Sequence, residues 1–399
     1  MEKRFIPRSI EEITPDWLTS ALKKTGILKD NSVSSIEVET IGEQGYMGIL
    51  ARLYLDYETP GDMLPASIIA KMPTKEAKNK ITGEIFLNYE RENRLYETLL
   101  DKLPVRTPKC YFADMDAGVS ERTVNFAYFV YEKMPKGFIN LFLIIFGLFT
   151  LISKRRYILL IEDLKDLDYI DQRDGCSFED AKQVIKYLGA MQAAFWENPA
   201  VNQYWLKAHS EISRLMGLLY EKGLPVIERN FGDRLSAKEK EVFKWLQDHN
   251  QQIDDYILSR PKTLVHSDFR IDNVFFDRIK NKTVLIDWQT CYRGLGIADL
   301  AYFCAGSGIN PFTSDQVQEL IEIYHQALIE GGVTNYSLEE CQNDYKYGFF
   351  VALRYILIIL GTLEIDKDPD VKKLVELWLM RMKPSIENFD LSIMFAEAK

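Results

Sequence analysis

The stretch LVHSDFRIDNVFFDRIKNKTVLIDWQTCYRGLGIADLAYF, residues 264–303, is the most informative part of the chain. A short apolar strand leads into His266 and Asp268, Asn273 follows, and a second apolar strand, TVLID, ends in Asp287. We expect strand, loop and returning strand to bring Asp268, Asn273 and Asp287 into one cleft, because a sheet holds the loops at its strand ends rigidly. Phosphoryl transfer uses such a set: one carboxylate faces an acceptor hydroxyl, while a carboxylate and an amide oxygen hold magnesium against nucleotide phosphates. A single aspartate at the end of a strand does not by itself indicate catalysis, since aspartate often ends strands. The spacing of Asp268, Asn273 and Asp287 together favours a catalytic role.

The composition is that of a globular protein. The chain has 399 residues, of which 47% are hydrophobic and 27% charged. That length exceeds what one hydrophobic core usually covers, so we expect two lobes. The formal net charge of −10 disfavours nucleic acid as a partner, because nucleic-acid binders usually carry a basic surplus. A bound polyphosphate would need local cations or metal ions.

The five cysteines indicate a reducing compartment. They are scattered, odd in number, and form no CxxC pair, so neither a disulfide framework nor a zinc site is expected. The first residues, MEKRFIPRSIEEITPDWL, lack the apolar core of a signal peptide. We therefore expect a cytoplasmic protein.

Residues 1–162 predict a small α+β lobe, in which apolar–polar alternation gives way once to a helical period. The predicted elements are a helix over 15–24 capped by Thr14, a glycine-bearing hairpin over 34–58, a strand stopped by Pro73, a helix over 82–102, and strands over 108–114, 124–132 and 157–162.

Residues 163–399 predict a mainly helical lobe. Ser177 and Asp180 form a capping box before an apolar stripe. Further helical patterns recur over 236–258, 313–330, 337–362 and 370–390, interrupted by β-rich pieces at 262–277 and 283–288.

The apolar run FINLFLIIFGLFTLI, residues 138–152, is inserted in the first lobe between basic flanks. As a helix it would reach roughly 22 Å, short of the ~30 Å hydrocarbon core of a bilayer. We interpret it first as a segment packed against or between the lobes. A membrane-surface helix, giving peripheral membrane contact, and a lid over a lipophilic substrate are the alternatives.

HSDFRIDN followed by IDWQ resembles the catalytic core of the aminoglycoside-phosphotransferase-like kinases, and most closely their choline-kinase-like and ecdysteroid-kinase-like branch. The resemblance implies a protein-kinase-like bilobal α+β fold that uses ATP and Mg²⁺ on a hydroxyl of a small molecule. It further implies a nucleotide-binding N-lobe over 1–162 and a helical C-lobe over 163–399. The catalytic loop would span 264–277 and the metal-binding strand end 283–289.

The resemblance also assigns roles within the C-terminal motif. Asp268 matches the catalytic base, while Asn273 and Asp287 match the magnesium ligands. Asp299 matches an aspartate that braces the catalytic loop, and His266 matches the loop histidine, whose expected task is structural hydrogen bonding.

In the N-lobe, Lys71 matches the lysine that contacts the α- and β-phosphates. Glu92, on the helix that follows, matches the glutamate that pairs with that lysine. Glu84 and Glu90 are competing candidates for the pairing.

Two further features would complete the nucleotide site. GEQGYMG allows backbone amides to approach phosphates, although its spacing differs from GxGxxG and also suits a plain hairpin turn; its glycines are Gly42, Gly45 and Gly48. Glu162 and Asp163 lie where the family's inter-lobe hinge would bind adenine through backbone groups.

The sequence departs from the family pattern twice. Ser267 replaces the glycine of HGD, and a positive φ at that position would cost serine about 1–2 kcal/mol. Gln192 stands where the HAxFW helix of the ecdysteroid-kinase-like branch carries histidine, just before the aromatic pair Phe195 and Trp196.

The acceptor stays open at this stage. The many aromatic residues (22 Phe, 21 Tyr and 6 Trp) and the apolar run lean toward an apolar or sterol-like alcohol. If the protein is a kinase, an aminoglycoside-type or choline-type acceptor is the alternative. If it is not an active kinase, the alternative is a nucleotide-binding pseudokinase that senses a ligand. The oligomeric state and the choice between ATP and GTP are not indicated by the sequence.

Overall fold

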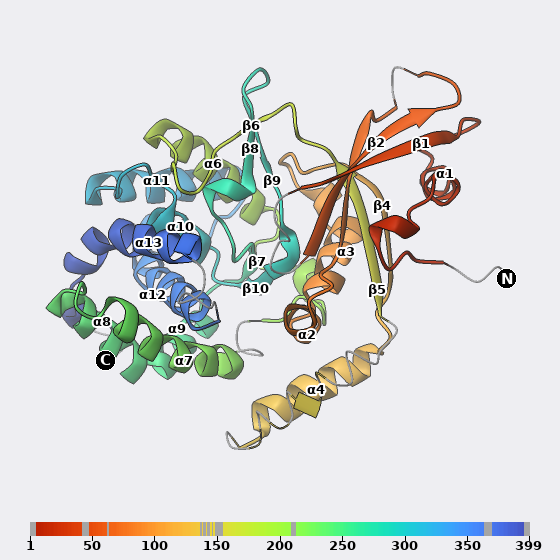
Figure 1. Ribbon diagram of the computed structural model, residues 1–399. Helices are drawn as coiled ribbons and strands as arrows, with labels where there is room; N and C mark the ends of the chain where they lie inside the picture. The colour runs from red at the N-terminus through yellow and green to blue at the C-terminus, as the bar shows by residue number, and fades with distance from the viewer. Residues whose placement is uncertain are drawn as a thin grey trace. The chain divides into compact units, whose positions relative to one another are not determined.

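This computed structural model describes residues 5–41, 48–61, 64–135, 155–208, 213–362 and 369–394, together with positions 138, 141, 144, 145 and 147. The chain forms two compact units (Figure 1). Unit 1 comprises residues 1–167 and 284–290, and unit 2 comprises residues 168–283 and 291–399. The mixed architecture, with the large sheet in unit 1 and most helices in unit 2, confirms the α+β class. The functional division at residues 162 and 163 stays a prediction.

Unit 1 is built on a five-stranded antiparallel sheet with the order β1-β2-β3-β5-β4. The strands are β1 (Val33–Thr40), β2 (Gly48–Tyr57), β3 (Ser67–Pro73), β4 (Cys110–Asp116) and β5 (Arg156–Glu162). The predicted hairpin is β1 and β2, and β3 ends at Pro73 as predicted, because proline has no N–H to extend the ladder.

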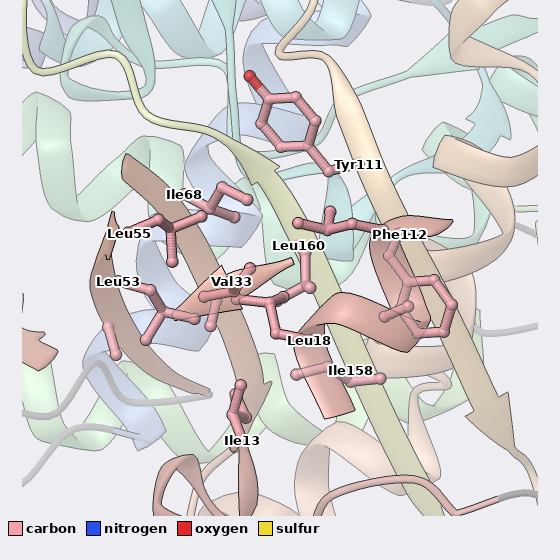
Figure 2. Packing of buried hydrophobic residues seen from close by; sticks show 14 of the residues in the cluster. Ile13, Leu18, Val33, Leu53, Leu55, Ile68, Tyr111, Phe112, Ile158 and Leu160 are labelled. Atoms are coloured by element: carbon pink, nitrogen blue, oxygen red, sulfur yellow. The ribbon is translucent and has the colours of Figure 1, made fainter. Parts of the chain in front are cut away.

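One face of this sheet carries the core of unit 1 (Figure 2). Helix α1 (Pro15–Lys24) begins at Thr14, whose side chain accepts from the Trp17 N–H, and its Leu18 packs in the cluster with side chains from all five strands. Successive residues of a strand face opposite sides. Ile68, Ala70 and Met72 of β3 enter the core, so Lys71 faces the other side.

On the side of the sheet that Lys71 faces lie two helices, whereas the sequence predicted one. Helix α2 (Ala77–Ile85) and helix α3 (Asn88–Thr98), followed by a short 3₁₀ turn (Leu100–Lys102), replace the single helix expected over 82–102. The chain breaks at Leu87, whose φ of 58° lies in the left-handed region. A leucine does not predict this conformation, because glycine and asparagine are the residues that normally adopt it.

The strand predicted over 124–132 is wrong, because this segment lies in helix α4 (Glu121–Lys133). Val124, Phe126, Tyr128 and Val130 alternate as a strand would, yet the buried side chains are Val124 and Tyr131, two helical turns apart. The Ser120 side chain caps the helix by accepting from the Thr123 N–H. Serine followed by a glutamate is the start signal that the alternation obscured.

Unit 2 contains most of the helices, as predicted. They are α6 (Phe178–Ala193), α7 (Ser213–Phe231), α8 (Ala237–Asp248), α9 (Asn250–Ser259), α10 (Ile297–Gly306), α11 (Ser314–Glu330), α12 (Leu338–Thr362) and α13 (Pro369–Glu387). Short strands accompany them: β6 (Asp168–Tyr169), β7 (Thr263–Val265), β8 (Val274–Asp277), β9 (Lys282–Leu285) and β10 (Tyr292–Gly294). β7 pairs with β10, and the order of the other sheet is β6-β8-β9.

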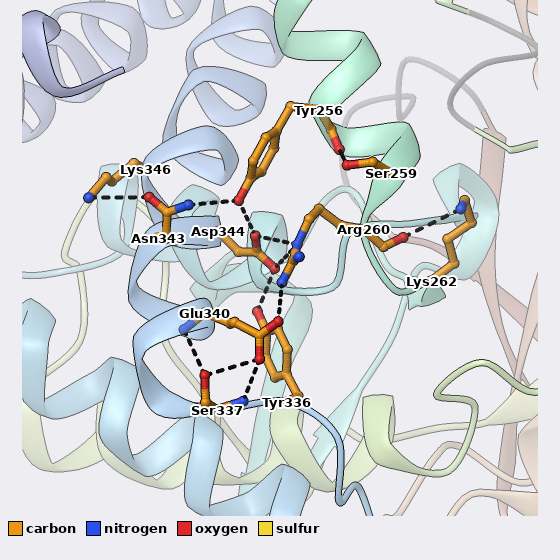
Figure 3. Close-up of polar contacts among 10 residues, drawn as sticks. All are labelled: Tyr256, Ser259, Arg260, Lys262, Tyr336, Ser337, Glu340, Asn343, Asp344 and Lys346. Atoms are coloured by element: carbon orange, nitrogen blue, oxygen red, sulfur yellow. Dashed lines mark hydrogen bonds and ion pairs between the residues drawn. The ribbon is translucent and has the colours of Figure 1, made fainter. Parts of the chain in front are cut away.

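A buried carboxylate joins two helices of unit 2 (Figure 3). Asp344 of α12 is fully buried, and it accepts hydrogen bonds from the hydroxyls of Tyr256 in α9 (2.6 Å) and Tyr336 (2.9 Å). The guanidinium of Arg260 completes the set at 2.7 Å. A buried charge is tolerated when it is paired in this way, so the network ties α9 to α12.

Of the helices that the structure describes, none is both long and apolar enough to cross a membrane. The predicted apolar run 138–152 lies largely outside the described residues.

Candidate functional site

A half-buried lysine in unit 1, Lys71, bridges two carboxylates that are distant in sequence. Lys71 Nζ lies 2.8 Å from Glu92 Oε1 and 2.6 Å from Asp287 Oδ1. Glu92 also accepts from the backbone N–H of Trp288 at 3.3 Å. The glutamate therefore holds both the lysine and the backbone that follows Asp287.

Strand alternation and helix placement build this cluster. Lys71 projects from the face of β3 opposite the core, and Glu92 comes from α3. The competing glutamates have other partners: Glu84 pairs with Arg155 at 2.5 Å, and Glu90 pairs with Arg94 at 2.8 Å.

The two carboxylates keep Lys71 charged. Burial lowers the pKa of the Lys71 ammonium, but the charges of Asp287 and Glu92 outweigh this effect, so the pKa is raised above its ordinary value. A permanently protonated ammonium is a phosphate ligand.

Gly48 lines a small pocket with Lys71 and Glu92. A Cβ at Gly48 would lie 3.1 Å from the Met72 carbonyl oxygen, so glycine permits the close approach of β2 and β3. Gly42 and Gly45, the other two glycines of the predicted phosphate loop, lie outside the described residues.

Glu162, the predicted hinge residue, ends β5. Its backbone N–H donates to the Lys109 carbonyl (2.8 Å), and its side chain pairs with Arg106 (2.7 Å). Adenine binding by this segment stays a prediction.

The loop after β7 in unit 2 surrounds Asp268 with polar partners. The Asn273 amide nitrogen donates to the Asp268 carbonyl (2.8 Å) and to its carboxylate (3.0 Å). Arg270 Nε lies 2.9 Å from Asp268 Oδ1, and its Nη1 lies 3.0 Å from Asp272 Oδ2. The Tyr302 hydroxyl is 3.4 Å from Asp268 Oδ1. These contacts fix the direction of the Asp268 carboxylate.

Asp299, in the first turn of the buried helix α10, holds the same loop through its backbone. Its two oxygens accept from the backbone N–H groups of His266 (2.7 Å) and Ser267 (2.8 Å). Burial raises the pKa of Asp299 to about 7, although these hydrogen bonds oppose the shift. The His266 ring is buried and its edge meets Phe269.

Gln192, the second departure from the family pattern, contacts this brace. Its amide nitrogen donates to Asp299 Oδ2 (2.9 Å) and to the Gly296 carbonyl (3.1 Å), and its oxygen accepts from the Tyr324 hydroxyl (2.5 Å). Glutamine thus links α6, α10 and α11 at the position where the resemblance led us to expect histidine.

Two residues of the motif adopt left-handed backbone conformations: Ser267, with φ 73°, and Asp287, with φ 63°. Ser267 therefore has the positive φ that we expected to cost a serine about 1–2 kcal/mol at this position. Strain of this kind concentrates at functional sites.

Each unit contains one oxygen donor of a kind that magnesium accepts. In unit 2 the Asn273 side chain is held by its amide nitrogen within its own loop, and in unit 1 Asp287 supplies a partly exposed carboxylate. Among the described residues, no group of three or more His, Cys, Asp or Glu could hold a metal alone. Magnesium does not require one, since it commonly combines one or two carboxylates with phosphate oxygens and water.

Sequence reasoning missed Arg270 and Tyr302 as neighbours of Asp268. Arg270 stands inside the quoted motif, and a cation two residues after a candidate base was an available signal. Tyr302 lies one helical turn after Asp299, and that spacing alone would not have identified it.

Comparisons with known proteins agree with this fold. The sequence model of the ecdysteroid kinase-like family matches residues 42–333. The structure is similar to a candidate aminoglycoside phosphotransferase from Ralstonia eutropha JMP134, with 14% identity, 92% of this chain and 95% of that chain covered, and a TM-score of 0.50. It is similar to choline kinase from Cryptosporidium parvum Iowa II, with 11% identity, 93% and 96% covered, and a TM-score of 0.50. At these identities the likeness shows the fold, which is that of protein-kinase-like phosphotransferases.

No curated protein sequence matches this chain. Because the family match spans well over half of the residues, the chain belongs to the ecdysteroid kinase-like family.

Proposed function

We propose that this protein transfers the γ-phosphoryl group of ATP to a hydroxyl of a small molecule. The observation that carries the proposal is Lys71, a half-buried cation held between Glu92 (2.8 Å) and Asp287 (2.6 Å). Phosphoryl transfer uses a lysine that is paired with a glutamate and lies near a carboxylate able to hold the metal ion, and Lys71, Glu92 and Asp287 have this arrangement.

The ATP-binding residues are assigned by their chemistry. Lys71 binds the α- and β-phosphates, and Glu92 holds the lysine in position. Asp287 and Asn273 hold Mg²⁺, which neutralises phosphate charge when bound. The Gly48 backbone covers the phosphates, and backbone groups near Glu162 bind adenine.

Asp268 is the base in this proposal. It accepts the proton of the acceptor hydroxyl as the new O–P bond forms and the bond from the γ-phosphorus to the bridging oxygen breaks, leaving ADP. Arg270 and Asn273 orient its carboxylate, and Asp299 holds the loop through the backbone of His266 and Ser267. Positioning and charge neutralisation supply most of the rate enhancement.

The acceptor in this proposal is a neutral, largely apolar alcohol. Its support is the aromatic content of the chain and the apolar run over residues 138–152. Five free cysteines support a reducing compartment such as the cytoplasm.

The test is ADP release by the purified chain with ATP, magnesium and a panel of alcohols. Asp268→Asn should lower turnover at least about a hundredfold and leave ATP binding intact. Asp277→Asn, which changes a carboxylate at the end of β8, is the matched control and should retain activity. Turnover by Asp268→Asn at the wild-type rate would contradict the proposal. Nucleotide binding without turnover on any alcohol would favour a sensor.

A further inference from the structure

Helix α4 carries an unusual stripe of exposed side chains. Arg122, Phe126, Phe129 and Lys133 are all exposed, and at about 100° per residue they fall within an arc of about 60°. Phe126 is 66% exposed and Phe129 is 62% exposed. We call these four residues the α4 stripe.

The opposite face of α4 is the one attached to unit 1. Val124 and Tyr131 are buried there, and the Tyr128 hydroxyl donates to the Ile85 carbonyl at the end of α2 (2.6 Å). The two phenylalanines therefore do not complete the core of unit 1, and their exposure needs another explanation.

The apolar surface continues along the chain. Four more large side chains are between 54% and 61% exposed, namely Phe138, Leu141, Ile144 and Ile145, and their spacing is that of one helical face. Gly147 is buried, and a Cβ there would lie 3.2 Å from Ile81 of α2. Gly147 thus lies against α2, and the four apolar side chains named above are exposed. Contiguous exposed apolar side chains mark an interaction surface.

Charge decides which partner fits. The stripe has a cation at each end, whereas the acidic residues Glu121 and Glu132 lie about 90–110° around the helix from its centre. A second copy of the chain fits poorly: parallel pairing sets Arg122 against Arg122, and antiparallel pairing sets Arg122 against Lys133. A partner with an apolar interior beneath an anionic surface fits both the phenylalanines and the cations.

We propose that the α4 stripe, with Phe138, Leu141, Ile144 and Ile145, docks on a membrane that contains anionic phospholipid. Phe126 and Phe129 enter the boundary between headgroups and acyl chains, while Arg122 and Lys133 face lipid phosphates. The surface would bring the protein to the compartment in which an apolar alcohol dissolves. The inference rests on these exposed side chains and does not depend on the proposed phosphotransfer.

The test is sedimentation of the full chain with vesicles of phosphatidylcholine, with and without phosphatidylserine. We expect binding to the anionic vesicles. The double variant Phe126→Ser/Phe129→Ser should weaken it at least about tenfold. Arg122→Gln/Lys133→Gln should weaken it by a similar factor, and added salt should do the same to the wild type.

Two matched controls change exposed side chains elsewhere. Ile279→Ser removes an apolar side chain that is 97% exposed in unit 2, and Lys244→Gln removes an exposed cation of α8; both should bind like the wild type. Unchanged unfolding midpoints would show that the stripe variants remain folded.

Three outcomes would overturn the proposal. The first is that the wild type binds neither kind of vesicle, and the second is that the double serine variant binds as well as the wild type. The third is a dimer, seen by light scattering without vesicles and lost in the serine variant, which would assign the stripe to self-association.

Discussion

Ser267 offers the sharpest test of the loop geometry, because it is a serine at φ 73°. A left-handed conformation costs a residue with a Cβ about 1–2 kcal/mol. The Ser267 side chain in turn hydrogen-bonds to Tyr355, a contact worth about 1 kcal/mol. Serine therefore offsets much of the backbone cost with a side-chain bond that glycine cannot make.

Two substitutions separate these contributions. Ser267→Ala keeps the backbone cost and loses the hydrogen bond, so it should lower the free energy of unfolding by about 1 kcal/mol. Ser267→Gly loses the same bond but removes the backbone cost, partly offset by about 0.4–1 kcal/mol for the freedom of glycine in the unfolded chain. The glycine variant should therefore be more stable than the alanine variant by about 0.5–1 kcal/mol.

Urea unfolding of the three proteins measures this order. Tyr355→Phe supplies the control, because in that background Ser267→Ala should cost almost nothing further. An alanine variant equal to or more stable than the glycine variant would refute the reasoning, since a positive φ at this position could then carry no cost.

Three other perturbations follow from the structure. Lys71→Met should weaken ATP binding at least about tenfold, because the unpaired carboxylates of Glu92 and Asp287 then repel the phosphates; calorimetric titration measures this, and unchanged affinity would exclude Lys71 from the site. Arg155→Met should destabilise unit 1 by about 3–5 kcal/mol, since it leaves the buried Glu84 unpaired; an unchanged urea midpoint would contradict this. Burial raises the pKa of Asp299 to about 7, above about 4 in the unfolded chain, so the folded state binds this proton more tightly. The free energy of unfolding should therefore gain a contribution from Asp299 below about pH 4 that is lost as the pH rises through about 7, and Asp299→Asn should remove that slope in unfolding curves measured from pH 4 to 8.

Strand alternation made the sheet of unit 1 predictable. The apolar residues of β3 on one face and Lys71 on the other follow directly from a period of two. Glu92 was distinguished from Glu84 and Glu90 by family resemblance, and the structure gives those two residues other arginine partners.

The misses have physical causes. Alternating apolar residues in α4 imitate a strand, and only the cap at Ser120 distinguishes the two readings. The left-handed Leu87 breaks a continuous helical pattern because tertiary packing overrides its local preference. Arg270 and Tyr302 approach Asp268 through the three-dimensional path of the loop and α10, which residue spacing does not reveal.

The central claim is that this chain binds ATP through Lys71 and a magnesium ion held at Asp287. Its most direct test is the thermal shift of the purified chain with ATP, measured with and without magnesium. At a hundredfold excess over the dissociation constant, binding should add about 2.7 kcal/mol, a rise on the order of 5 °C. We expect a magnesium-dependent rise in the unfolding temperature with ATP, which Asp287→Asn abolishes and Asp277→Asn retains. No rise with either form of ATP would contradict it.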